Sequence, residues 1–185
     1  ATAQIWRRGV EKVLALREPV LEVRRSDVES LIRALVATAR HFVDPENWGA
    51  NAAILARSEY LDGSAELIQR SISDRLLLSQ SGALVHYPDF MFQYREAANF
   101  PWGSQAQWLY SQMARWDSAG FDADDAVSAA RVFRPDVYRS ALFGSPEPLP
   151  GASSKVEGSL GGTTVVGTQQ GSMTLESNTF FDGRV

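Results

Sequence analysis

Cysteine is absent from the 185 residues of this chain. Its absence excludes disulfide bonds, thiolate nucleophiles, cysteine–zinc sites and iron–sulfur clusters. Histidine is scarce as well, because the sequence contains only His41 and His86, and their spacing is not that of a zinc-binding pair on one helix. The sequence therefore predicts no metal site.

Long apolar runs and an excess of positive charge are also missing. No apolar run approaches the roughly 18 residues that suggest a membrane-spanning helix, so we expect no transmembrane segment in this chain. Lys and Arg number 18 against 22 Asp and Glu, which makes the net charge −4. This balance argues against a strongly basic protein that binds nucleic acid directly.

Motifs of catalysis are absent too. The sequence has no nucleophile elbow of the G-x-S-x-G type, and the glycine-rich residues 161–164 lack the lysine of a phosphate-binding loop. Asp122, Asp124 and Asp125 form an acidic cluster without the distal Glu and central Gly of a calcium loop, which favours helix capping. We predict no catalytic residue and no cofactor, so the chain is not expected to be an enzyme.

What is present is an ordinary globular composition, with 44% hydrophobic and 22% charged residues. Apolar residues at helical spacing predict helices over about 26–43, 45–61, 64–72, 101–116, 122–133 and 135–142. The apolar residues 13–16 fit either a buried strand or a helical turn. The aromatic residues 90–94 likewise fit either a strand or a helix.

Capping residues frame several of these helices. Ser26 and Glu29 have the spacing of a capping box, while Asp44 and Ser64 stand where N-caps are expected. On the helix over 101–116 one stripe is predicted to face the core, with Trp108 outside it. The stripe consists of Trp102, Gln105, Leu109, Met113 and Trp116.

The composition changes at Ser145. Residues 145–171 hold six Gly and three Pro and few large apolar side chains, so they cannot form a core of their own. Phe180 and Phe181 then supply two apolar anchors. We therefore predict two regions: residues 1–144 as a folded body, and residues 145–185 as an extended Gly/Pro/Ser-rich tail that docks on it.

Lysine is rare, since Lys12 and Lys155 stand against sixteen arginines. A lysine ammonium is a compact charge that suits a small inorganic anion. Lys12 lies beside the apolar run 13–16, at the edge of a possible strand. From the residues alone, an ordinary solvated lysine remains the alternative interpretation of Lys12.

Five segments together resemble one protein family: the nitrate- and bicarbonate-binding proteins of ABC importers, which are related to cytoplasmic nitrate sensors and to sulfonate-binding proteins. The segments are EKVLAL (11–16), ANFPWGSQAQW (98–108) continued by QMARW (112–116), FRPDVYR (133–139), KVEG (155–158) and FFDGR (180–184). They occur in the family's order and spacing.

The resemblance implies an α/β fold of the two-lobed, type II periplasmic-binding-protein kind. This chain would be a mostly helical C-terminal portion of it with an extended tail, and the front lobe would lie outside the chain. Lys12 matches an anion-binding lysine that the family carries in a Gly-His-Pro-Glu-Lys segment, although Arg8, Gly9 and Val10 stand here instead of Gly-His-Pro. The family's other anion contacts cannot be assigned to this chain, and Trp102 is expected to be structural.

The implied function is binding of a small inorganic anion, nitrate or nitrite first and bicarbonate as a further possibility, as the solute-binding component of a bacterial ABC importer. The implied partner is an ABC permease, and the location is the periplasm or the membrane face. Two alternatives remain open. One is a cytoplasmic nitrate-responsive sensor that binds an RNA-binding antiterminator, and the other is a truncated product without binding activity.

A missing front lobe would leave an apolar face of this chain uncovered. We therefore expect the isolated chain to self-associate or to be poorly soluble, because exposed apolar patches drive association. Light scattering on the purified chain measures this directly. A monodisperse monomer would contradict the expectation.

Overall fold

The computed structural model describes residues 2–77 and 79–184, which divide into two compact units. The first unit combines residues 1–34 with 96–185, and the second comprises residues 35–95. The boundary near residue 34 lies inside a helix that runs through both ranges. The division predicted from composition, after residue 144, stays a prediction.

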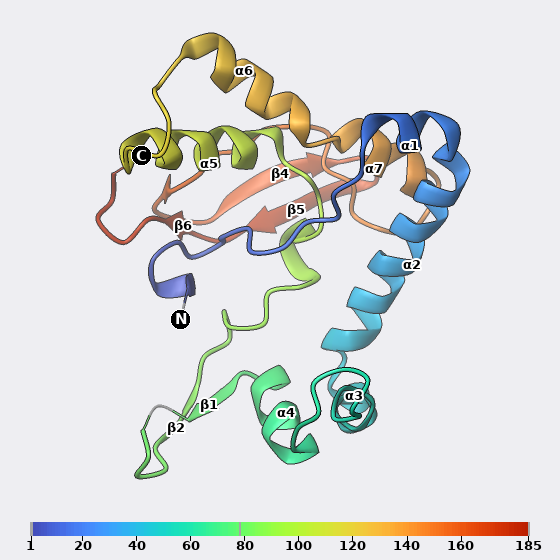
Figure 1. Ribbon diagram of the computed structural model, residues 1–185, viewed down its shortest axis with the longest axis vertical. Helices are drawn as coiled ribbons and strands as arrows, with labels where there is room; N and C mark the ends of the chain where they lie inside the picture. Colours follow the sequence, from blue (N-terminus) through green and yellow to red (C-terminus); the bar gives the residue numbers. More distant parts are fainter. Residues whose placement is uncertain (1, 78, 185) are drawn as a thin grey trace. The chain divides into compact units, whose positions relative to one another are not determined.

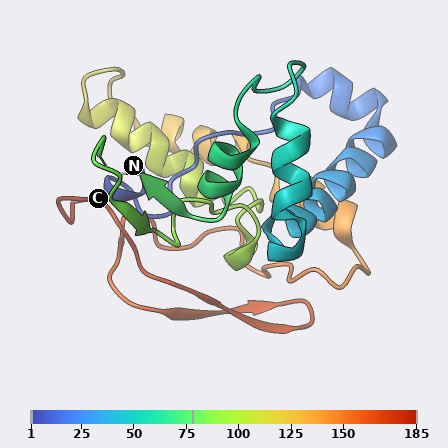
Figure 2. The ribbon, with the colours of Figure 1, turned by 90° about the horizontal axis from the view of Figure 1, so that it is seen from below.

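The first unit joins helices to short antiparallel sheets (Figure 1). Strands β3 and β6 pair with each other, as do β4 and β5, and Figure 2 shows the β4–β5 hairpin as a long twisted ribbon along one side of this unit. Its elements are η1 (Thr2–Gln4), α1 (Glu18–Val23), the first part of α2 (Arg25–Val43), α5 (Gly103–Arg115), α6 (Ala123–Val132), α7 (Pro135–Leu142), β3 (Ser159–Leu160), β4 (Thr164–Thr168), β5 (Gly171–Leu175) and β6 (Asn178–Thr179), with η3 (Arg95–Ala97) at its edge.

The second unit holds the remainder of α2 and a hairpin. Strands β1 and β2 pair antiparallel, with Leu76 opposite Val85. Residues 90–94, for which either a strand or a helix was expected, form neither. The other elements of this unit are η2 (Pro45–Asn47), α3 (Trp48–Leu55), α4 (Ala65–Ile72), β1 (Arg75–Leu77) and β2 (Leu84–His86).

Three predicted N-caps are confirmed. Asp44 accepts a hydrogen bond from the backbone N–H of Glu46, and Ser64 accepts one from Leu67. Asp122 accepts bonds from the backbone N–H groups of Asp124 and Asp125 at the start of α6. Each cap satisfies donors that have no partner within the helix.

The predicted capping box at Ser26 is wrong. Helix α2 begins at Arg25, directly after α1, so Ser26 lies inside the helix. Glu29 instead accepts hydrogen bonds from the Arg25 guanidinium at 2.7 Å and from the Ser140 hydroxyl at 2.7 Å. Helix α1 was not among the predicted helices; it carries Pro19 in its first turn, where proline is favourable.

The buried face of α5 also differs from the predicted stripe. Trp102 and Gln105 are buried as expected, but Met113 and Trp116 are 50% and 61% exposed. Trp108, placed outside the stripe, is only 6% exposed. The buried residues of α5 therefore lie in its N-terminal half, from Gly103 to Trp108.

Two aromatic clusters form the core of the first unit. Phe100 and Trp102 are each 1% exposed and meet edge to face, with Tyr138, Val166 and Met173 packed around them. In the second cluster the rings of Trp6 and Trp108 stack at 3.9 Å between centroids, and Phe180 meets Trp108 edge to face. Aromatic pairs of this kind add about 1 kcal/mol each beyond the area they bury.

The C-terminal segment after α7 contributes to this core. Leu149, Leu175 and Phe180 are buried, and the backbone N–H of Phe180 donates to the carbonyl of Gly158 at 2.7 Å. Phe181 is 62% exposed, so only one of the two terminal phenylalanines reaches the interior.

A buried polar cluster lies beside the second aromatic cluster. The Glu157 carboxylate accepts hydrogen bonds from the Ser104 hydroxyl at 2.9 Å, the Asn178 amide at 2.8 Å and the Lys155 ammonium at 2.6 Å. Burial raises the pKa of Glu157 above its ordinary value, against the opposing effect of these donors.

The titration of Glu157 makes a testable contribution to stability. Because its pKa is raised in the folded state, its stabilising contribution is full below the ordinary carboxyl value of 4.5 and is lost as the pH rises through the raised pKa. The relevant quantity is the difference between two free energies of unfolding, that of the wild type minus that of Glu157→Gln. We expect this difference to fall as the pH rises through this window. Urea unfolding at several pH values measures the difference. A flat or rising curve for Glu157→Gln would contradict the prediction.

Gly158 offers a second test of packing. Its φ is +72°, and a Cβ there would stand 2.5 Å from Nε1 of Trp108. We expect Gly158→Ala to lower the free energy of unfolding by about 2 kcal/mol or more, from overpacking and backbone strain together. The matched control is Gly161→Ala, since nothing lies within 4 Å of that Cβ position. Equal urea midpoints for the two variants would refute this account.

Candidate functional site

Lys12 lies on an irregular, exposed segment that precedes α1. Neither an ion pair nor a hydrogen bond occupies its side chain among the residues that the structure describes. The neighbouring apolar residues 13–16 form neither the strand nor the helical turn that was considered for them, and Val13, Leu14 and Leu16 are 44–59% exposed. Lys12 is therefore an accessible cation, and its role in anion binding stays a prediction.

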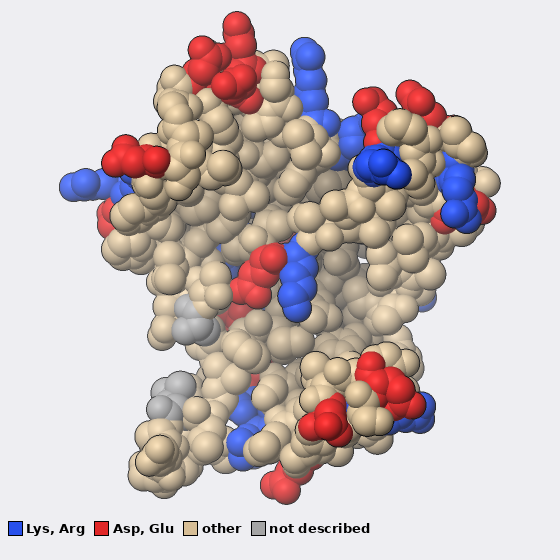
Figure 3. Space-filling model, in the orientation of Figure 1, with Lys and Arg blue, Asp and Glu red and all other residues tan. Residues whose placement is uncertain are grey.

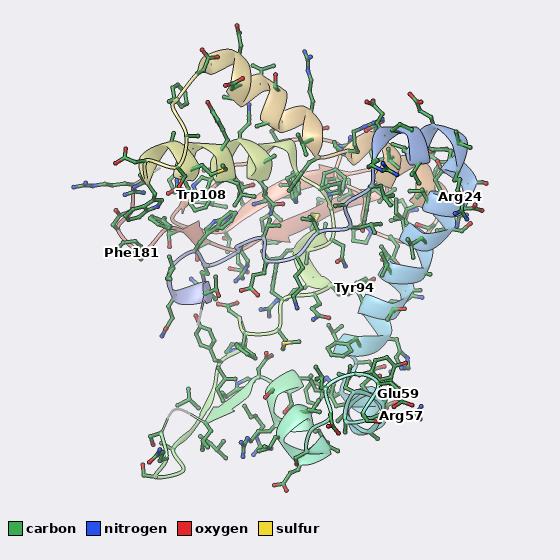
Figure 4. All side chains as sticks on the ribbon, viewed as in Figure 1. Arg24, Arg57, Glu59, Tyr94, Trp108 and Phe181 are labelled. Atoms are coloured by element: carbon green, nitrogen blue, oxygen red, sulfur yellow. The ribbon has the colours of Figure 1, made fainter. Side chains whose placement is uncertain are left out.

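The residues just before Lys12 are anchored. The backbone N–H of Gly9 donates to the carbonyl of Trp6 at 3.2 Å, and a Cβ at Gly9 would approach the Trp6 indole to 3.1 Å. Val10 packs against the cluster of Trp6, Trp108 and Phe180. Figure 4 shows Trp108 on α5, within this first unit. The chain thus leaves a packed aromatic cluster two residues before Lys12.

Residues 5–8 are joined to the C-terminal end of the chain. The backbone N–H of Arg7 donates to the Thr179 carbonyl at 3.2 Å, and that of Phe181 donates to the Ile5 carbonyl at 2.7 Å. Trp6 and Phe180 form the antiparallel bridge between these two bonds. The N-terminal segment is therefore held by an isolated β-bridge and its flanking hydrogen bonds against residues that lie about 170 positions away.

Arg8 is the residue at which the sequence departs from the Gly-His-Pro of the resembled family. Its side chain is 6% exposed and forms a salt bridge to Glu96, with Nη2 at 2.9 Å from Oε1 and Nε at 3.3 Å from Oε2. Glu96 and Ala97 both have positive φ, 56° and 49°, a conformation that L residues adopt only when their surroundings enforce it. Sequence reasoning missed this pair because its members are 88 positions apart.

The other residues considered from sequence have structural roles. His41 lies in the last turn of α2, where Nδ2 of Asn47 is 3.1 Å from its Nδ1. Trp102 belongs to the aromatic core, as expected. Residues 161–164 lead into β4 rather than into a helix. Within 2–77 and 79–184, no group of three or more His, Asp or Glu side chains could hold a metal ion.

The second unit contains an apolar hollow that does not suit an anion. Among the residues that the structure describes, no charged side chain lines it. The lining consists of Phe42, Leu55, Leu61, Leu67, Ile68, Ser71, Ile72, Met91 and Gln93. On the face in Figure 3, Lys and Arg side chains lie near Asp and Glu in small groups, so no broad positive surface is visible there. No described helix is both long enough and apolar enough to cross a membrane.

Comparisons with curated proteins find transport proteins for small oxyanions, while no protein-family model matches the chain. The chain is 26% identical over 145 residues to the nitrate import ATP-binding protein NrtC of Synechococcus elongatus, which covers 78% of the chain and 22% of that protein. It is 27% identical over 140 residues to the bicarbonate transport ATP-binding protein CmpC of the same species, covering 75% of the chain and 20% of that protein. It is 24% identical over 156 residues to the nitrate/nitrite binding protein NrtA of this species, covering 83% and 35%.

Among solved structures, the crystal structure of the periplasmic nitrate-binding protein NrtA from Synechocystis matches with a TM-score of 0.77 at 19% identity. The match covers 95% of this chain and 44% of that one, so the chain spans less than half of the protein whose fold it shares. The predicted fold class and the resemblance stated from sequence are both confirmed: the chain has the fold of part of a periplasmic binding protein and resembles the nitrate- and bicarbonate-binding proteins of ABC importers.

Proposed function

We propose that this chain is part of a protein that binds a small planar oxyanion, nitrate or nitrite first, for uptake by an ABC importer. The observation that carries the proposal is the fold shared with a periplasmic nitrate-binding protein over 95% of the chain. Its expected partner is an ABC permease, and its expected place is the periplasm or the membrane face. The proposed role is recognition without a chemical step.

In this proposal Lys12 supplies the positive charge for the anion. Its ammonium has three donors and no partner among the described residues, which leaves it available to a ligand. The anchored residues Gly9 and Val10 support it from one side. Anchoring of the backbone just before Lys12 lowers the entropy that this segment loses on binding, which favours affinity.

Bicarbonate is a second candidate ligand, favoured by the similarity to the bicarbonate transport protein CmpC. Nitrate and bicarbonate are both planar monoanions, so one cation could serve either. Parallel calorimetric titrations with nitrate, nitrite and bicarbonate would rank them.

The test of the proposal is Lys12→Ala in the protein that contains this chain. We expect the substitution to abolish tight nitrate binding in isothermal titration calorimetry, because the attraction to the ammonium is lost. The matched control is Arg17→Ala, which removes an exposed cation farther along the same irregular segment and should leave the affinity unchanged. An affinity for Lys12→Ala within about threefold of the wild type, less than 1 kcal/mol, would exclude Lys12 as the ligand.

A further inference from the structure

Asn178 is the most buried polar residue of the first unit, at 2% exposure. Its side chain makes two hydrogen bonds to segments far apart in the sequence. Nδ2 donates to Oε2 of Glu157 at 2.8 Å, and Oδ1 accepts from the backbone N–H of Arg8 at 3.2 Å. Only this orientation of the amide pairs each donor with an acceptor, so both neighbours fix it.

Glu157, the hydrogen-bond acceptor of the Asn178 amide, is itself held in place by other groups. Its carboxylate is held by the Ser104 hydroxyl in the first turn of α5 and by the Lys155 ammonium. The Ser104 hydroxyl also accepts the backbone N–H of Lys155 at 3.0 Å. The amide of Asn178 is therefore positioned from α5, an element whose own position is set by the aromatic core.

On its other side Asn178 binds the backbone of Arg8, four residues before Lys12. Arg8 is the last residue of the N-terminal segment that pairs with the C-terminal end. After it, Gly9 packs on Trp6 and Val10 packs on the aromatic cluster, and Lys12 follows in solvent. Within the described part of the chain, the bond from Arg8 to Asn178 is thus the last hydrogen bond to the C-terminal segment before the exposed lysine.

We propose that Asn178 is a positioning residue for Lys12: strand β6, through this amide, fixes the segment from which the lysine projects. The link to anion affinity rests on the proposed function. The positional claim does not, because it concerns the segment itself and can be measured without any anion.

The absence of cysteine makes that measurement direct. Lys12→Cys introduces a single thiol for a nitroxide spin label, whose mobility is read by electron paramagnetic resonance. Asn178→Asp keeps the size of the side chain, retains an acceptor for Arg8, and places a carboxylate against that of Glu157. At a pH at which both carboxyl groups are ionised they repel each other, so residue 178 loses its hydrogen bond to Glu157. We expect the label at position 12 to become clearly more mobile.

A second label separates local from general loosening. Ser128→Cys places the probe on the exposed face of α6, and its mobility should be the same with and without Asn178→Asp. An unchanged label at position 12, or equal changes at both positions, would overturn the proposal. If Asn178→Asp does not fold, as judged by a thermal melt, Asn178→Ala takes its place, since it removes both hydrogen bonds without adding charge.

Nitrate affinity supplies the second readout. If the segment occupies its competent position a tenth of the time in Asn178→Asp, the apparent affinity falls about tenfold. In a Lys12→Ala background the same substitution should cause no further loss. If folded Asn178→Asp keeps full nitrate affinity while Lys12→Ala abolishes binding, the effect of Asn178 on affinity is refuted. The proposed function would be unaffected by that result. Unchanged affinity in Lys12→Ala would instead exclude Lys12 as the anion ligand, and the label at position 12 would still decide the positional claim.

Discussion

Two buried carboxylates, Glu96 and Glu157, organise the first unit. An ionised group that leaves water costs several kcal/mol unless charges and donors replace its hydration, so each carboxylate demands partners. Glu96 accepts hydrogen bonds from the Arg8 guanidinium and from the backbone N–H of Glu176. Glu157 accepts hydrogen bonds from the side chains of Ser104, Lys155 and Asn178. These partners come from both ends of the chain and from its middle, so satisfying the two charges draws the N-terminal segment, α5 and β6 together.

The aromatic cluster of Trp6, Trp108 and Phe180 depends on the same arrangement. Each ring comes from one of the three segments that the carboxylates join. The close fit of Gly9 on Trp6 and of Gly158 on Trp108 leaves no room for a Cβ at either glycine without movement. The polar and the apolar contacts therefore favour the same arrangement of these three segments. Lys12 lies at the edge of that arrangement. An accessible cation on a rigid support suits the recognition of a small anion better than one on a mobile loop.

Much of the local structure was predictable. The N-caps Asp44, Ser64 and Asp122 and the helices they begin were found from short sequence patterns, because capping involves neighbours within three residues. Motifs such as ANFPWGSQAQW indicated the binding-protein fold that the structural comparison then supported. The failures also have local causes. Ser26 and Glu29 match a capping box, but α2 already begins at Arg25, so Ser26 lies inside the helix and not at its N-cap.

The sequence by itself determined the classes of chemistry that are excluded, most of the helices, and Lys12 as the candidate cation. Tertiary structure alone decided which half of α5 is buried, that Phe180 packs inside while Phe181 stays exposed, and that Arg8 pairs with Glu96. It also decided that the Asn178 amide contacts both Arg8 and Glu157. The physical reason is that these properties depend on contacts between residues 50 to 170 positions apart, and no local pattern of capping or periodicity carries that information.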